Sequence, residues 1–142
     1  MTILVAYTPT PAAEAALAFG ISEAKLRGER LVVVNSSKGT ARVDARLASD
    51  EQLSSLDAQL ASSGIDHVLE QPNRGREAVE EILDAAEQHA ASMIIIGTRH
   101  RSPVGKFIMG STAQQIILDS PIPVVAVKAA TEEHHKRKYR HE

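Results

Sequence analysis

The sequence predicts an α/β protein built on one mainly parallel five-stranded sheet. Five short apolar runs alternate from end to end with longer segments that carry helical periodicity. Parallel neighbouring strands need long crossover connections, and helices are the usual crossovers. Several of the runs are rich in Val and Ile with no polar alternation, which is typical of strands buried on both faces. The length of 142 residues fits a single domain, which we expect over residues 1–130.

The first strand and helix have clear boundary signals. Residues 3–6 form a short apolar run that is closed by a turn rich in Thr and Pro. Thr10 suits the N-cap and Pro11 the first turn of a helix over residues 12–27. Gly28 supplies the helix stop.

The next elements are less uniform. Residues 31–34 read as a strand that is buried on both faces. Leucines spaced among polar residues predict an amphipathic helix over residues 43–62, with a poorly defined start and an end near Gly64. Residues 65–70 form a more polar strand, which favours a place at the edge of the sheet.

The third helix and the fourth strand carry the strongest periodic signals. We expect the helix over residues 77–90, with Ile82 and Ala86 on its apolar face. Residues 93–96 are the most apolar of the strands. Because ligands of such sheets bind beyond the carboxyl ends of the strands, the loops after the first and fourth strands should face each other there.

The chain closes with one more helix and strand. A helix is expected over residues 111–118, with Ile116 and Ile117 turned inward, and a fifth strand over residues 124–127. Residues 131–142 are charged and lack apolar periodicity, which predicts a flexible tail. The histidines of this tail could chelate a metal weakly, but a flexible tail gives them no ordered surroundings, so we predict no specific metal site.

Composition narrows the functional classes. The net charge is −2 and aromatic residues make up only 3%, which argues against a nucleic-acid surface. There is no Cys, so thiol catalysis and Cys-ligated zinc are excluded. No segment approaches the roughly 20 apolar residues of a membrane helix, and no signal-like start is present, so we expect a cytoplasmic protein with no membrane partner.

The segment after the fourth strand predicts an anion pocket. The strand ends at Gly97, a basic loop follows, and Gly110 and Ser111 open the last helix. Unpaired N–H groups at a helix start carry partial positive charge and accept phosphate oxygens. Glycines let the backbone approach a ligand closely. The basic residues of this loop are Arg99, Arg101 and Lys106. These features predict a phosphate-bearing ligand, with a nucleotide favoured.

Simpler interpretations remain open at this point. Gly97 could be an ordinary turn residue, and Ser111 could act only as the N-cap of the helix. The three cations could form a solvated loop. No carboxylate is placed by the sequence to orient His100 as a base, so we predict no catalytic residue.

The same segment resembles a specific family pattern. Universal stress proteins carry Gly, two residues, Gly, nine residues, and then Gly-Ser or Gly-Thr. Here Gly97 is followed by two residues, His100, nine residues, and Gly110-Ser111, and a Pro-Val-Val sequence starts at Pro123. The chain resembles this family over nearly its whole length.

The resemblance implies a fold, an assembly and a ligand. The fold would be a doubly wound, Rossmann-like sheet of the adenine nucleotide alpha-hydrolase type, with strand order 3-2-1-4-5. The assembly would be a homodimer formed through the last strand, Val124 to Val127. One branch of the family binds ATP, and the related ligands AMP and ADP are also possible, with magnesium left open. The implied nucleotide-binding residues are Thr8, Thr10, Val33, Val34, Gly97, Arg99, His100, Gly110, Ser111 and Thr112.

Two departures from the family pattern leave a second function open. His100 stands where the pattern has its middle Gly, and Thr8 stands where ATP-binding relatives carry Asp. The first hypothesis is a dimeric ATP-binding regulatory module of the stress response. The alternative is a dimeric universal stress protein that binds no nucleotide and acts through protein contacts. An ATPase or nucleotidyl transferase has little support, because no paired-carboxylate magnesium cluster accompanies the loop.

Overall fold

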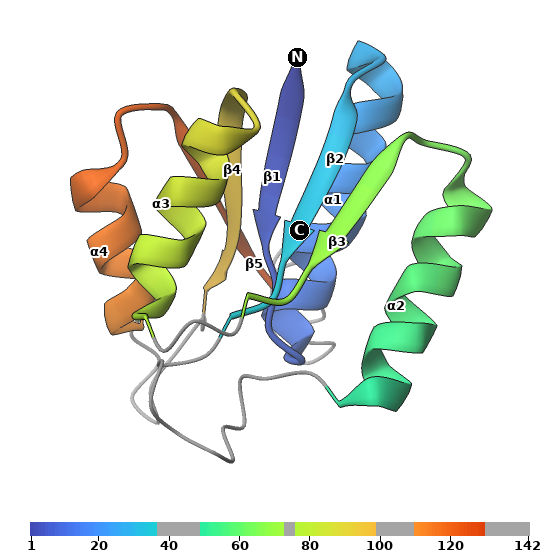
Figure 1. Ribbon diagram of the computed structural model, residues 1–142, viewed down its shortest axis with the longest axis horizontal. Coiled ribbons are helices and arrows are strands. Elements are labelled where there is room, and N and C mark those ends of the chain that lie inside the picture. Colours follow the sequence, from blue (N-terminus) through green and yellow to red (C-terminus); the bar gives the residue numbers. More distant parts are fainter. Residues whose placement is uncertain (37–48, 73–75, 99–109, 130–142) are drawn as a thin grey trace, which may run out of the picture.

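The computed structural model describes residues 1–36, 49–72, 76–98 and 110–129. In these residues five strands alternate with four helices, as Figure 1 shows. Their order is β1 (Thr2–Ala6), α1 (Pro11–Arg27), β2 (Arg30–Val34), α2 (Asp50–Ser63), β3 (His67–Glu70), α3 (Ala78–Gln88), β4 (Ala91–Thr98), α4 (Ser111–Asp119) and β5 (Val124–Lys128). The expected tail over residues 131–142 lies outside the described residues.

The strands form one parallel sheet in the order β3-β2-β1-β4-β5. The α/β class, the parallel sheet and the strand order implied by the family resemblance are therefore confirmed. The polar strand β3 lies at an edge, as its composition predicted. In Figure 1 the chain starts at the top of β1, so the carboxyl ends of all five strands point downward.

Helices cover both faces of the sheet (Figure 1). On one face, α1 and α2 pack against side chains that include Val5, Val33 and Ile95. On the other, α3 and α4 pack against Leu4 and Val32, among others. Every residue from Leu31 to Val34 is fully buried, which confirms that this strand is covered on both sides.

The ends of α1 follow the sequence signals. Thr10 is extended at the N-cap, and its hydroxyl accepts a hydrogen bond from the Ala13 amide at 3.1 Å. Pro11 occupies the first helical position, where a missing N–H costs nothing. Gly28 ends the helix in the left-handed region at φ 65°, which favours glycine. These local signals determine where α1 begins, and therefore place its amino terminus beside the carboxyl ends of the strands.

The start of α2 differs from the expectation. Ser49 is extended and forms a capping box with Gln52, so the helix begins at Asp50 and not at residue 43. Residues 43–48 lie outside the described residues. The cap outweighs the apolar spacing upstream, because it satisfies the first free amide groups of the helix.

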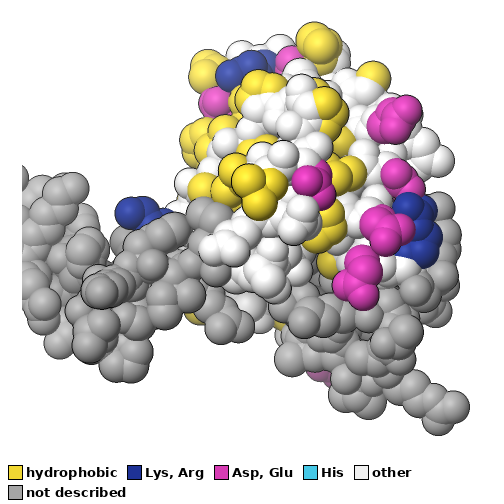
Figure 2. All heavy atoms as spheres, turned by 90° about the vertical axis from the view of Figure 1, so that its left-hand side faces the viewer, with side chains coloured by type: hydrophobic (Ala, Val, Ile, Leu, Met, Phe, Trp, Pro, Cys, Tyr) yellow, Lys and Arg dark blue, Asp and Glu magenta, His cyan; other side chains and the backbone are white. Residues whose placement is uncertain are grey.

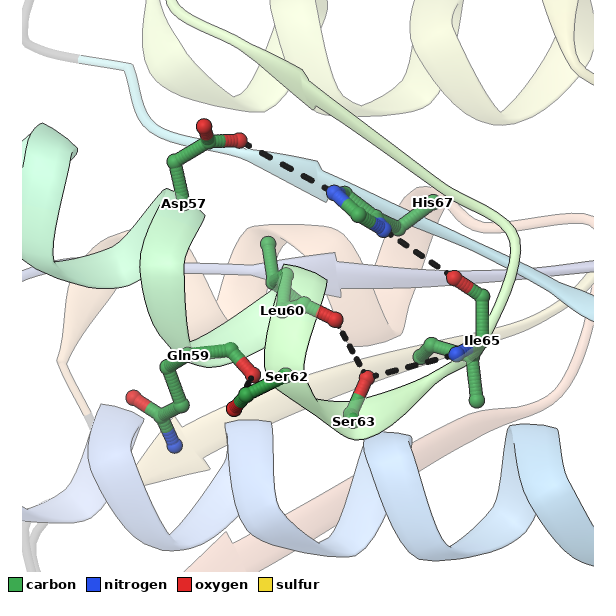
Figure 3. Close-up of polar contacts among 7 residues, drawn as sticks. All are labelled: Asp57, Gln59, Leu60, Ser62, Ser63, Ile65 and His67. Atoms are coloured by element: carbon green, nitrogen blue, oxygen red, sulfur yellow. Dashed lines mark hydrogen bonds and ion pairs between the residues drawn. The ribbon is translucent and has the colours of Figure 1, made fainter.

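Polar contacts join the end of α2 to β3 (Figure 3). The Ser63 hydroxyl donates to the Leu60 carbonyl at 2.5 Å, and Gly64 ends the helix at φ 78°. On β3, the His67 ring reaches back to Asp57 of α2 at 3.8 Å and to the Ile65 carbonyl at 3.1 Å. The strand β3 starts at His67, two residues after the expected start.

The prediction that Ile117 lies in the core is wrong. Ile116 of α4 is buried, but its neighbour Ile117 is 42% exposed. Successive residues of a helix point about 100° apart, so a short helix at one end of a sheet turns only one of two adjacent side chains inward. Among the described helices, none has the length and apolar character needed to cross a membrane.

Candidate functional site

A pocket of about 740 Å³ lies at the carboxyl ends of the strands. It is bordered by the turn after β1, by the ends of β2 and β4, and by the first residues of α1, α3 and α4. Its lining is Ala6, Tyr7, Thr8, Thr10, Pro11, Ala12, Val34, Ser36, Ala78, Ile82, Ile96, Gly97, Thr98, Gly110, Ser111, Thr112, Ala113, Ile116 and Ala129. In the sheet β1 lies between β2 and β4. The connection after β1 leads to β2 on one side, and the later strand β4 is added on the other side, so the strand order reverses at β1. Ligands of open α/β sheets bind at this kind of reversal point.

The amino terminus of α4 forms one wall of the pocket. Its N-cap is Gly110, which is extended at φ −66° and ψ 156° and provides no side-chain cap. Ser111 is the first helical residue, so the interpretation of Ser111 as the N-cap is wrong. The first amides of a helix have no partner inside the helix and carry its positive end charge. This wall therefore suits an anionic group.

A second helix terminus meets the pocket at Thr10. Its hydroxyl caps α1, and it lies 3.4 Å from the Thr8 hydroxyl. Thr8 is half-buried and Thr10 is exposed. Because the Thr10 oxygen already accepts the Ala13 amide, only its proton and remaining lone pair are available to a ligand.

The two glycines at the pocket play different structural roles. A Cβ atom at Gly97 would lie 2.5 Å from the carbonyl carbon and oxygen of Ala12 and 2.6 Å from the Ala13 nitrogen. A Cβ atom at Gly110 would meet nothing within 4 Å. Gly97 thus allows β4 to pack directly on the backbone of α1, a packing role that the sequence did not reveal. Gly110 borders open space.

The pocket brings together seven of the ten residues that the sequence singled out. They are Thr8, Thr10, Val34, Gly97, Gly110, Ser111 and Thr112. Val33 does not line the pocket, because it is fully buried among the core side chains on the α1 face. Arg99 and His100 lie outside the described residues, as do the other cations of that loop.

The sequence reasoning missed several lining residues. They include Tyr7 in the turn after β1, the hydroxyl-bearing residues Ser36 and Thr98, and Ala78 and Ile82 of α3, which supply apolar surface. Ser36 and Thr98 stand at the carboxyl ends of β2 and β4, a position that could have marked them. The part of the chain that the structure describes holds no group of three metal-ligating side chains.

A buried amide fixes the backbone beside the pocket. Asn35 is fully buried and donates from Nδ2 to the Tyr7 carbonyl at 2.9 Å. The Gln71 amide donates to Asn35 Oδ1 at 2.8 Å. These bonds connect the turn after β1 to the ends of β2 and β3, so three strand ends hold one another in place.

Tyr7 has a strongly perturbed hydroxyl. It is 5% exposed, and its hydroxyl donates to the Glu14 carboxylate of α1. Burial raises the pKa of Tyr7 well above its ordinary value, and the hydrogen bond to Glu14 and the charge of that carboxylate add to the shift. The folded protein therefore keeps this phenol neutral at a pH at which an unfolded chain loses the proton.

We predict that Tyr7→Phe changes how stability depends on pH. In the native protein the Tyr7 contribution is fully present below pH ~10 and falls above it, because only the unfolded chain then ionises this phenol. The variant should lose about 1 kcal/mol of unfolding free energy at pH 8 through the lost hydrogen bond. Between pH 10 and 11 the unfolding free energy of the variant should fall by less than that of the native protein. Chemical denaturation at each pH measures the unfolding free energy of both proteins. If the two free energies changed with pH in parallel, the prediction would be contradicted.

The comparisons with known proteins agree with one another. The chain matches the model of the universal stress protein family over residues 1–128. A universal stress protein from Mycolicibacterium smegmatis is 44% identical over 126 residues, which cover 89% of this chain and 96% of that protein. A solved universal stress protein from Archaeoglobus fulgidus has a TM-score of 0.77 and 36% identity, covering 90% of this chain and 98% of that one. A solved complex of the universal stress protein from the same organism with dAMP has a TM-score of 0.70 and 30% identity, with the same coverage.

Proposed function

The chain belongs to the universal stress protein family, and on that premise we propose that its pocket binds an adenine nucleotide as a regulatory ligand. The observation that carries this proposal is the amino terminus of α4, which opens into the pocket with no side-chain cap at Gly110. Such a terminus attracts phosphate. The relative whose complex holds dAMP supports the choice of an adenine nucleotide.

The proposed orientation follows from the lining. The phosphates lie at Gly110, Ser111 and Thr112, where the charge of the helix terminus is positive. The adenosine lies towards Thr8 and Val34, at the ends of β1 and β2. Of the two valines expected near adenine, we retain Val34, since Val33 is enclosed by the core.

We propose ATP as the ligand, with AMP and ADP as related candidates. Arg99 and His100 belong to the loop that leaves β4, so they are the side chains we assign to the outer phosphates. The role we propose is binding that alters protein contacts in the cytoplasm, without turnover of the nucleotide.

Calorimetric titration tests this function. Purified protein is titrated with ATP, ADP, AMP, cyclic AMP and adenosine, each with and without magnesium. We expect saturable binding of at least one phosphorylated ligand and weaker binding of adenosine. If none of the ligands gives heat or a thermal shift at near-millimolar concentration, the alternative of a universal stress protein without nucleotide is supported instead.

We also propose that the protein forms a homodimer through β5. This strand pairs with β4, and among the described residues no strand covers its outer edge. Open strand edges pair readily with a second chain. On α4, the helix that precedes β5 in the chain, Ile117 and Leu118 are 42% and 76% exposed. Figure 2, which views the side of the molecule that carries α4, shows hydrophobic side chains gathered on this face.

A charge on the open strand should separate the dimer. Ala126 is exposed on β5, so Ala126→Lys adds a charge at the interface without burying it in the core. We expect light scattering to give the mass of a dimer for the native protein and of a monomer for this variant. Ala61→Lys on the exposed side of α2 is the matched control and should remain dimeric. A native protein that is monomeric at tens of micromolar would contradict the proposal.

A further inference from the structure

Two buried hydroxyl groups at the pocket have no hydrogen-bond partner among the residues that the structure describes. Ser36 is 4% exposed and Thr98 is 2% exposed, and both line the pocket. Within the described part of the chain neither Ser36 Oγ nor Thr98 Oγ1 has a partner, and both atoms are shielded from solvent. Buried polar groups in folded proteins are nearly always paired, so each exception calls for a specific explanation.

The positions of the two residues suggest the explanation. Ser36 follows β2 and Thr98 ends β4, so they flank β1 on opposite sides. Neighbouring strands lie about 4.8 Å apart, which places the ends of β2 and β4 roughly 10 Å from each other. One phosphate group is too small to reach both hydroxyls, whereas an extended ligand such as a nucleoside phosphate is long enough.

We propose that Ser36 and Thr98 are specificity-determining residues that bind the two ends of one nucleoside phosphate. The inference rests on the proposed nucleotide function. Thr98 belongs to the strand that leads towards α4, so its hydroxyl donates to a phosphate oxygen. Ser36 lies two strands away, beside Val34, so its hydroxyl bonds to the nucleoside. A hydroxyl can donate and accept, which suits both partners.

This assignment predicts opposite effects on stability and on binding. Removing a partnered hydroxyl destabilises a protein, whereas replacing an unpartnered buried one with an apolar group of the same shape is neutral or stabilising. Thr98→Val keeps the shape of the side chain, and Ser36→Ala removes one atom. Without ligand, the melting temperature of both variants should therefore equal or exceed that of the native protein.

The affinities for AMP and adenosine should distinguish the residue at the phosphate end of the ligand from the residue at its nucleoside end. Thr98→Val loses a hydrogen bond to a charged group, so its affinity for AMP should drop at least about 10-fold while its affinity for adenosine stays the same. Ser36→Ala loses a neutral hydrogen bond, so its affinity for AMP and for adenosine should drop about 3- to 10-fold alike. Because the sites lie far apart, the losses in the double variant should multiply.

The test is calorimetry with AMP and adenosine, together with thermal unfolding of the free proteins. Thr2→Val and Ser92→Ala are matched controls at the opposite end of the sheet, and Ser92 Oγ donates to the Thr2 carbonyl at 3.3 Å. Both controls should bind AMP as the native protein does, and Ser92→Ala should melt at the same or a lower temperature. Native affinity in Ser36→Ala and Thr98→Val would overturn this inference alone. A native protein that binds neither AMP nor ATP would overturn the proposed function as well.

Discussion

Replacing Gly110 with Asp is expected to lower the affinity for AMP and ATP at least about 100-fold while leaving the fold intact. A Cβ atom at this position meets nothing within 4 Å, and the backbone is already extended, so the new side chain fits. Asp is also a favourable N-cap, and its charge suits the amino terminus of a helix. The free protein should therefore melt at the native temperature or slightly above it.

The loss of affinity comes from charge. A carboxylate at Gly110 would occupy the place and the electrostatic role that we assign to the phosphate. Two like charges about 4 Å apart near a protein surface repel by roughly 4 kcal/mol. After a reduction for solvent screening, this repulsion still corresponds to about 100-fold in affinity.

Calorimetry on three proteins checks this prediction. Gly110→Asn is the control, because Asn has the shape of Asp and caps a helix equally well without its charge. It should bind AMP within a few-fold of the native protein, and adenosine should bind all three alike. If Asn and Asp weaken AMP binding equally, the phosphate does not lie at α4.

Replacing Gly97 with Ala is expected to have the largest effect on stability. The added methyl group would lie 2.5 Å from backbone atoms of Ala12, and backbone cannot move aside as a flexible side chain can. Overpacking of this kind costs about 3 kcal/mol. For a domain of this size we expect the melting temperature to fall by roughly 10 °C.

Thermal and chemical unfolding measure the effect, with Gly110→Ala as the control. That position is open, so the control should lose less than about 1 kcal/mol. Because Ala12 and Gly97 both line the pocket, Gly97→Ala should weaken nucleotide binding even at temperatures at which it is folded. Equal stability of the two alanine variants would mean that α1 does not pack tightly on β4.

Local signals made much of the fold predictable from the sequence. Thr10 and Pro11 mark the start of α1 and Gly28 marks its end, and each acts on backbone only a few positions away, so no distant contact is needed to interpret them. The valines of β2 carry no alternation because both faces of the sheet are covered. The order of the strands came from the resemblance around Gly97 and Gly110, since periodicity alone does not specify which strands are neighbours.

The features that escaped prediction depend on competition or on distant packing. The start of α2 was misplaced because the spacing of leucines extends upstream of the Ser49 cap. Ile117 was assigned to the core because composition does not show how much of α4 the sheet can cover. The tight fit of Gly97 against Ala12 joins residues that are far apart in the chain, and a sequence shows glycine without showing what lies beside it.

The burial of Ser36 and Thr98 is another feature that depends on distant packing and could not be predicted from the sequence. In the sequence both are ordinary polar residues at strand ends, and only the folded structure shows that their hydroxyls lack partners among the described residues. The apolar part of the pocket also depends on the fold, since Ile82 reaches it from α3 and Ile116 from α4.

The central claim is that the amino terminus of α4 binds the phosphate of an adenine nucleotide. Amide NMR spectra of the native protein, recorded during titration with AMP and separately with adenosine, test it most directly. We predict that the amide signals of Gly110, Ser111 and Thr112 shift progressively with AMP and hardly at all with adenosine. Shifts of equal size with both ligands, or AMP shifts that leave these three amides unchanged, would contradict the claim.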